Sequence, residues 1–204
     1  MTLTRTETER TAEPTTKGGR TRRRLLDHAV VAFARGGFRS TSVSGIAREV
    51  GITPGSAYAY FESKEELFTA AVDADAEALI ARALDEAKAP SVRDRLGLLL
   101  EALIRLLPEH PLAHRVLAGR EPGVLDRLLA LPSVEATTKQ FEEELATAQR
   151  DGAIRSDVDV AQLATGLETV ILTLLLATAQ LDDGAGSVRS DGVLALFDAA
   201  LRAP

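Results

Sequence analysis

The chain has 204 residues, a formal net charge of −6 at pH 7 and no cysteine. The missing cysteines exclude disulfide bonds, thiolate metal sites and a cysteine nucleophile. The longest apolar run, residues 170–177, is well below the roughly 20 residues of a membrane-spanning helix. The first residues also lack the apolar segment of a signal peptide. We therefore expect a cytoplasmic protein with no membrane partner.

The charge is distributed unevenly along the chain. Residues 1–64 carry 11 Lys and Arg against 6 Asp and Glu, whereas residues 65–204 carry 13 against 24. Binding to phosphate requires only a local basic surface, and an acidic remainder repels DNA and helps to orient the protein. The uneven charge is therefore compatible with nucleic-acid binding by the N-terminal part.

The first expected helix follows a polar segment. Residues 1–19 lack hydrophobic periodicity, and we expect them to form a disordered tail. Four arginines lie within residues 20–24. They form either a solvated helix end or a basic arm that contacts phosphate or the minor groove. An apolar stripe at helical spacing comes next and is stopped by Gly36 and Gly37; it consists of Leu26, Ala29, Val30 and Phe33.

Residues 41–64 predict two short helices and the start of a third. The first carries an apolar stripe of Val43, Ile46, Ala47 and Val50. Gly51 is suited to end it, because glycine adopts left-handed backbone without a Cβ penalty. Thr53 then stands at an N-cap with Pro54 at the first helical position of a helix over 54–61. Residues 63–66 form a capping box that starts the next helix. This order is a helix-turn-helix pattern.

In the segment GIAREVGITPGSAYAYFESKEEL, residues 45–67, the chain resembles the DNA-binding domain of the TetR family of transcriptional regulators. The agreement lies in the turn 51–53, in Tyr58, Tyr60 and Phe61, and in the run 64–67. It covers residues 21–72, and beyond them only length and helical pattern agree. The resemblance implies a helix-turn-helix domain over 20–66, an effector-binding and dimerisation domain over 67–204, and a homodimer on double-stranded DNA.

The predicted DNA contacts surround the short helix that starts at Pro54. Small residues there let the backbone approach the major groove, and the Ser56 hydroxyl can bond a base edge. The start of the preceding helix can hold a phosphate. The resemblance implies phosphate contacts by Tyr58, Tyr60 and Lys64, although ordinary packing also explains the tyrosines. The full predicted set is Thr41, Ser42, Ser44, Thr53, Pro54, Gly55, Ser56, Tyr58, Tyr60 and Lys64.

Two positions depart from the family pattern. Gly45 lies inside a helix, where it costs about 1 kcal/mol relative to alanine. Ala59 stands where larger side chains are common in the family, so little remains there to contact bases.

Helical spacing continues to the C-terminus and no stretch shows the alternation of a strand. We predict an all-α fold of about nine helices. The remaining helices are expected from residue 64 to before Pro90, and over 96–107, 111–119, 122–131 with 133–150, 158–181 and 190–202.

The helix over 158–181 is apolar over most of its circumference, which indicates burial on several sides. A central core helix explains this pattern. The resemblance implies instead that the last two helices of each subunit form a four-helix dimer interface. The predicted interface residues are Leu163, Leu167, Val170, Leu174, Val193, Phe197 and Leu201.

Aliphatic residues of the fifth to eighth helices predict a small, mostly apolar effector, because such walls favour shape-tolerant capture of an apolar body. Solid packing explains the same leucines, and Glu168 could equally face solvent or an interface. The predicted ligand-binding residues are Leu103, Leu107, His114, Leu117, Gln140, Phe141, Leu167 and Glu168.

The sequence indicates neither a metal, a cofactor nor an enzyme. His110 and His114 have a metal-capable spacing, but no third ligand follows and Pro111 leaves His110 outside the helix. No nucleophile stands beside a base, and no glycine-rich phosphate loop is present. We therefore predict a ligand-responsive transcriptional regulator, most simply a repressor of a palindromic operator. An activator or an effector-independent DNA-binding protein remains open.

Overall fold

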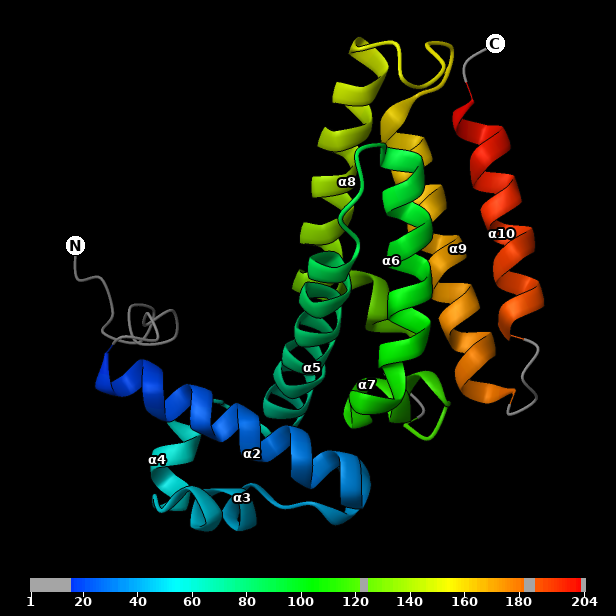
Figure 1. Cartoon of the computed structure of the whole chain (residues 1–204). Helices are drawn as coiled ribbons and strands as arrows, with labels where there is room; N and C mark the ends of the chain where they lie inside the picture. The colour runs from blue at the N-terminus through cyan, green and yellow to red at the C-terminus, as the bar shows by residue number, and fades with distance from the viewer. Residues whose placement is uncertain (1–15, 122–124, 182–185, 203–204) are drawn as a thin grey trace. The chain divides into compact units, whose positions relative to one another are not determined.

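The computed structural model describes residues 16–121, 125–181 and 186–202. The chain divides into two compact units, Met1–Asp75 and Ala76–Pro204. Within the described ranges the regular structure is helical and no strand occurs. Nine α-helices, α2 to α10, are joined by two short 3-10 helices in these ranges, so the predicted all-α class is confirmed (Figure 1).

The N-terminal unit contains α2 (Lys17–Ser40), α3 (Val43–Val50), α4 (Pro54–Tyr58) and the first part of α5 (Lys64–Glu86). Its core is formed by the apolar faces of these four helices, and two rings of α2 and α5 meet there edge to face, Phe33 and Phe68 at 4.9 Å between centroids. The fully covered residues include Leu25, Ala29, Phe33, Ile46, Ala47, Val50, Ala57, Phe61, Leu67 and Ala71.

Side chains cap three helix starts of the N-terminal unit, at Thr53 and Ser63 as the sequence predicted and also at Ser42. The Ser42 hydroxyl accepts from the Gly45 N–H at 3.1 Å, and the Thr53 hydroxyl accepts from the Ser56 N–H at 3.2 Å. The Ser63 hydroxyl accepts from the Glu66 N–H at 3.0 Å. Each bond satisfies one of the N–H groups that a helix start leaves without a partner.

Three details differ from the sequence prediction. The first helix starts at Lys17 rather than residue 20, because the Thr16 hydroxyl accepts from the Gly19 N–H at 2.9 Å. The helix from Pro54 ends at Tyr58 rather than residue 61. In the capping box, the Glu66 carboxylate accepts from the Glu62 N–H instead of closing on Ser63. The predicted tail falls largely on residues 1–15, which lie outside the described residues.

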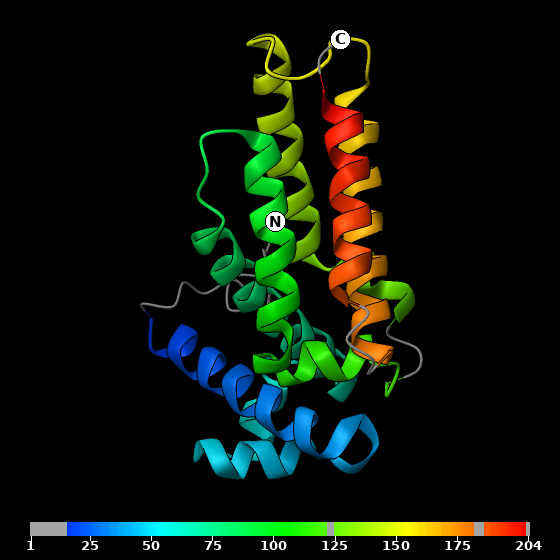
Figure 2. The same ribbon diagram turned by 45° about the vertical axis from the view of Figure 1, so that its right-hand side comes forward.

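The C-terminal unit contains the rest of α5, α6 (Val92–Leu106), η1 (Leu107–Glu109), α7 (Pro111–Leu117), η2 (Leu125–Ala130), α8 (Pro132–Arg150), α9 (Val160–Gln180) and α10 (Gly186–Leu201). Helices α6, α8, α9 and α10 lie alongside one another, and α9 packs against the other three (Figures 1 and 2). The expected helix over 122–131 is a 3-10 helix in its described part.

Helix α9 is, among the described residues, the one helix long and apolar enough to cross a membrane. Core helices of water-soluble proteins can have the same length and composition; 22% of this apolar stretch is buried within the chain, and α9 packs against α8 and α10. Its outward positions also include Thr165, Thr169 and Thr173, whose hydroxyls donate to the carbonyl four residues earlier at 2.7–3.0 Å. The structure therefore presents α9 as a bundle helix with one uncovered side.

Candidate nucleic-acid interface

The turn between α3 and α4 is fixed by backbone geometry at Gly51, whose φ of 79° and ψ of 33° are left-handed. The Gly51 N–H donates to the Arg48 carbonyl at 3.1 Å, and the Ile52 N–H donates to the Ala47 carbonyl at 3.0 Å. These bonds close the C-terminus of α3 as glycine caps do. The predicted stripe of α3 is buried, with Ala47 fully covered and Ile46 1% exposed. The left-handed turn at Gly51 and the buried stripe of α3 together produce the helix-turn-helix geometry.

Helix α4 is five residues long and is held by one small side chain, Ala57, which is 1% exposed. Pro54, Gly55 and Ser56 are exposed at its start, and Tyr58 is 48% exposed at its end. The turn of α4 that opens the helix therefore faces away from the core. A protruding helix start with small side chains matches the shape that enters a major groove.

The Thr53 and Ser56 hydroxyls form a pair, with 2.9 Å between their oxygens, beside the capping bond from the Ser56 N–H. Each hydroxyl has one proton and two acceptor lone pairs. One proton is used within the pair, so the other hydroxyl keeps its proton for an outside acceptor. The predicted base contact at Ser56 is thus coupled to the cap of its own helix.

The three hydroxyls at the start of α3 are in different situations. Ser44 is exposed, and Ser42 is exposed while capping α3. Thr41 is half-buried, and its hydroxyl donates to the Gly37 carbonyl at 2.9 Å and to the Ala32 carbonyl at 3.2 Å. The Thr41 proton is therefore already used to hold the end of α2. The local structure also explains why glycine stands at position 45: a Cβ there would lie 3.0 Å from the Ser42 Oγ, which caps the helix.

Tyr60 and Lys64 lie at the turn between α4 and α5, and both are half-buried. The Lys64 Nζ lies 4.5 Å from the centroid of the Phe38 ring and donates to the Arg39 carbonyl at 3.4 Å. Phe38 was not among the predicted site residues. The one feature of the sequence that could have pointed to Phe38 is its place directly after the Gly36-Gly37 pair, at the end of the first helix.

The arginines of α2 have largely structural partners. The Arg24 guanidinium donates to the Val50 carbonyl at 2.8 Å and so joins α2 to the end of α3. Arg22 lies over the Phe61 ring at 4.8 Å, and Arg23 pairs with Asp27 at 3.0 Å. Arg22 and Arg24 thus have partners within the protein, and a contact of this cluster with phosphate or the minor groove stays a prediction.

The predicted effector residues occupy the interior of the C-terminal unit, with three exceptions. Gln140 is exposed, and its amide donates to the Glu144 carboxylate at 3.0 Å. His114 and Glu168 are half-buried, and Glu168 accepts from the Thr138 hydroxyl at 2.6 Å. The five apolar residues of the set are between 1% and 8% exposed: Leu103, Leu107, Leu117, Phe141 and Leu167. These five side chains are packed inside the helical unit.

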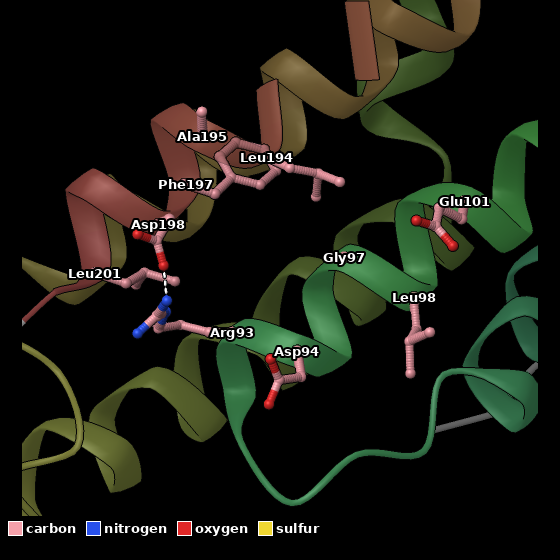
Figure 3. Close-up of a pocket in the computed structure, with 10 residues that line it drawn as sticks. All are labelled: Arg93, Asp94, Gly97, Leu98, Glu101, Leu194, Ala195, Phe197, Asp198 and Leu201. Carbon is pink, nitrogen blue, oxygen red and sulfur yellow. Dashed lines mark ion pairs between the residues drawn. The ribbon is translucent and has the colours of Figure 1, made fainter. Parts of the chain in front are cut away.

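A groove of about 560 Å³ lies between α6 and α10, and none of the predicted effector residues lines it. Figure 3 shows its two walls, with Gly97 on α6 facing the side of α10 that carries Leu194. An ion pair between Arg93 and Asp198 joins the two walls. The groove between α6 and α10 therefore lies at a different position from the predicted effector site.

The predicted dimer residues divide into two groups by their burial. Leu167 and Leu174 are 5% exposed, Phe197 is 6% exposed and Leu201 is fully covered within the single chain. Side chains with so little exposed area can gain little contact from a partner subunit, so in the protomer these four are core residues.

The second group keeps area that a partner could cover. Leu163, Val170 and Val193 are half-buried. Leu196 of α10 is 66% exposed and was not in the predicted set, because periodicity does not tell which of two apolar faces points outward. An interface on α9 and α10 would therefore rest on these four side chains.

The two histidines considered as metal ligands, His110 and His114, have contacts within the C-terminal unit. His110 is 5% exposed, and its Nε2 lies 3.4 Å from the Arg82 Nη1. His114 follows inside α7, and its backbone N–H donates to the His110 carbonyl at 2.9 Å. Across the described ranges, no group of three or more potential metal ligands occurs.

A family model described as bacterial regulatory proteins of the tetR family matches residues 25–71. These matches support a TetR-family regulator, with the family's DNA-binding domain at residues 25–71. The relatives include the transcriptional regulator UidR of Escherichia coli K12, which is 29% identical over 148 residues, 69% of this chain and 72% of UidR. The predicted family and a role in DNA-binding transcription regulation are thereby confirmed.

Solved structures share the fold. Salmonella enterica GusR has a TM-score of 0.63 at 22% identity, covering 93% of this chain and 99% of GusR. FadR of Bacillus subtilis, in complex with stearoyl-CoA, has a TM-score of 0.67 at 20% identity, covering 88% of this chain and 99% of FadR. TetR-family regulators bind DNA and small-molecule effectors and are dimeric, and they are regulators rather than enzymes.

The internal bonds of Thr41 predict a structural role. Thr41→Val should lower the free energy of unfolding by about 1 kcal/mol, because two carbonyls lose their donor. Ser44→Ala is the matched control and should change stability by less than about 0.5 kcal/mol, because its hydroxyl is exposed. Urea denaturation of the full chain measures both. Equal stability of the two variants would refute this structural role of the Thr41 hydroxyl.

Proposed function

We propose that the protein is a ligand-responsive repressor that binds a palindromic operator as a homodimer in the cytoplasm. The observation that carries the proposal is the exposed start of α4, held by Ala57 on a buried α3 and turned by Gly51. We further propose that residues 20–66 act as the DNA-binding domain and residues 67–204 as the effector-binding and dimerisation domain.

The proposed contacts divide into two classes. Ser56 and the exposed backbone at Pro54 and Gly55 lie at the helix start, which in this docking geometry contacts base edges. Tyr58, Tyr60, Lys64 and the two serines at the start of α3 contact phosphate, which positions the domain without selecting sequence. The excess of basic residues in 1–64 supports the second class. Thr41 and Thr53 support these contacts through the helix ends that they hold.

Dimerisation is supported by the uncovered side of α9 and α10. The half-buried Leu163 and Val170 of α9 and the exposed Leu196 of α10 leave apolar area that the single chain does not cover. A two-fold axis beside these helices would let each copy cover the other, since the same patch meets itself in such an interface. Two recognition helices about 34–36 Å apart would then meet successive major grooves of a palindrome.

Effector response is supported by the C-terminal unit, whose size exceeds what dimerisation requires. Its interior leucines are closely packed, so a ligand among α6 to α9 needs those helices to separate. A ligand that prefers the separated arrangement shifts the population toward it by its differential affinity. Movement of α5, which begins in the N-terminal unit and ends in the C-terminal unit, would change the spacing of the recognition helices. Repression would then end when the half-sites no longer match.

The phosphate contact predicts a change in salt dependence. Lys64→Met should weaken binding to all duplexes and lower the slope of log affinity against log salt by about 0.9 for each subunit bound, because one phosphate charge is no longer neutralised. Lys88→Met is the control, since Lys88 is exposed in the C-terminal unit and pairs with Asp85. A salt titration by fluorescence anisotropy measures the slopes. Identical slopes for wild type and Lys64→Met would refute the contact.

The proposed interface predicts the effect of one exposed leucine. Leu196→Glu should give a monomer that binds a palindromic duplex weakly, because a charge would enter a desolvated surface. Leu98→Glu on α6, where the leucine is 40% exposed, should remain a dimer. Sedimentation velocity separates the two cases. A dimeric Leu196→Glu variant would place the interface on another surface.

The effector proposal is tested first with a long-chain acyl-CoA, because FadR of Bacillus subtilis is in complex with stearoyl-CoA. Stearoyl-CoA should raise the melting temperature and release DNA over the same concentration range, whereas coenzyme A should do neither. Gly97→Met, which fills the groove between α6 and α10, should keep the response if the ligand binds among α6 to α9. Loss of the response would assign the site to the groove, and no response in wild type would exclude this ligand class.

A further inference from the structure

Lys64 is held by two groups from the end of α2. Its ammonium lies 4.5 Å from the centroid of the Phe38 ring, and it donates to the Arg39 carbonyl at 3.4 Å. A lysine ammonium has three N–H donors. The ring face and the carbonyl engage one side of the group, so a donor remains for a phosphate oxygen.

Phe38 is itself fixed by two other rings. Its ring stacks on Phe33 at 6.3 Å between centroids with 17° between planes, and it meets Phe68 edge to face at 5.2 Å and 69°. We call these three residues the aromatic cluster. Phe33 and Phe68 are buried, so the cluster joins Phe38 to the core of the N-terminal unit.

The backbone before Phe38 is fixed as well. Gly37 has φ 72° and ψ 173°, a conformation that an L side chain rarely adopts. The Thr41 hydroxyl donates to the Gly37 carbonyl at 2.9 Å and so closes the same corner. The ring beside Lys64 is therefore held from its backbone and from its side chain.

We propose that Phe38 is a positioning residue for DNA binding: its ring holds the Lys64 ammonium in place before DNA arrives. A free lysine side chain loses rotamer freedom when it binds a phosphate. Here part of that ordering occurs on folding, because the cation is attracted to the ring face. The inference rests on the proposed phosphate contact of Lys64.

A double-mutant cycle tests the proposal on the full chain, with a duplex selected by the wild type. Phe38→Leu should weaken binding about 2- to 5-fold per subunit, the range expected for a partly exposed cation over a ring. In the Lys64→Met background, Phe38→Leu should cause no further loss. Phe38→Tyr keeps the ring and should bind as the wild type does.

A second variant keeps the packing while changing the electrostatics. Pentafluorophenylalanine at position 38 has the shape of phenylalanine and an inverted ring quadrupole, so it should weaken binding as Phe38→Leu does. This variant replaces Phe38→Leu in the cycle if the leucine variant does not fold. Melting temperatures, measured in parallel, show whether the aromatic cluster remains intact.

The outcomes separate this inference from the proposed function. If Phe38→Leu weakens binding equally in the wild-type and Lys64→Met backgrounds, or has no effect in either, while Lys64→Met itself weakens binding, the positioning role alone is overturned. Unchanged affinity and salt slope for Lys64→Met would overturn the phosphate contact and the positioning role together. Non-additive losses, with wild-type binding by Phe38→Tyr, support both.

Discussion

The left-handed backbone at Gly51 is the constraint on which the interface depends. It turns the chain sharply enough that Thr53 can cap α4 immediately, and α4 is then only five residues long. A helix of that length has little surface of its own to bury, and Ala57 is its one buried side chain. Its position is therefore set by the turn before it and by the α3 stripe that anchors the turn. The same two features therefore also fix the position of the exposed residues of α4.

Several hydroxyl groups of the N-terminal unit form hydrogen bonds that stabilise the helix ends, and they also lie at the proposed DNA contacts. Ser42 and Thr53 accept backbone N–H groups at helix starts, and Thr41 donates to two carbonyls at the end of α2. These side chains stand where we propose that a phosphate or base approaches. A capping oxygen uses acceptor capacity, so the proton can still be donated outward, whereas a hydroxyl that donates inward has no proton to offer. This difference separates Ser42 from Thr41.

The C-terminal unit combines a closed interior with an uncovered side. Its helices pack closely enough to leave at most 8% of each predicted apolar wall residue exposed. On the outward side of α9, exposed threonines lie among half-buried aliphatic residues. The uncovered surface supports the proposed dimer, and the closed interior means that the proposed response to ligand requires a change in helix packing.

The sequence by itself determined the order of the helices, the caps at Thr53 and Ser63, and the resemblance to the family. Glycine, proline and hydroxyl residues act through local backbone geometry, so Gly51, Thr53 and Pro54 could be assigned from spacing alone. Tertiary structure decided which side of each apolar helix is covered, because a helix with two apolar stripes satisfies either orientation. It left Leu196 exposed while it covered Phe197 next to it. It also brought Phe38 beside Lys64, a contact between separate helices that no local pattern encodes.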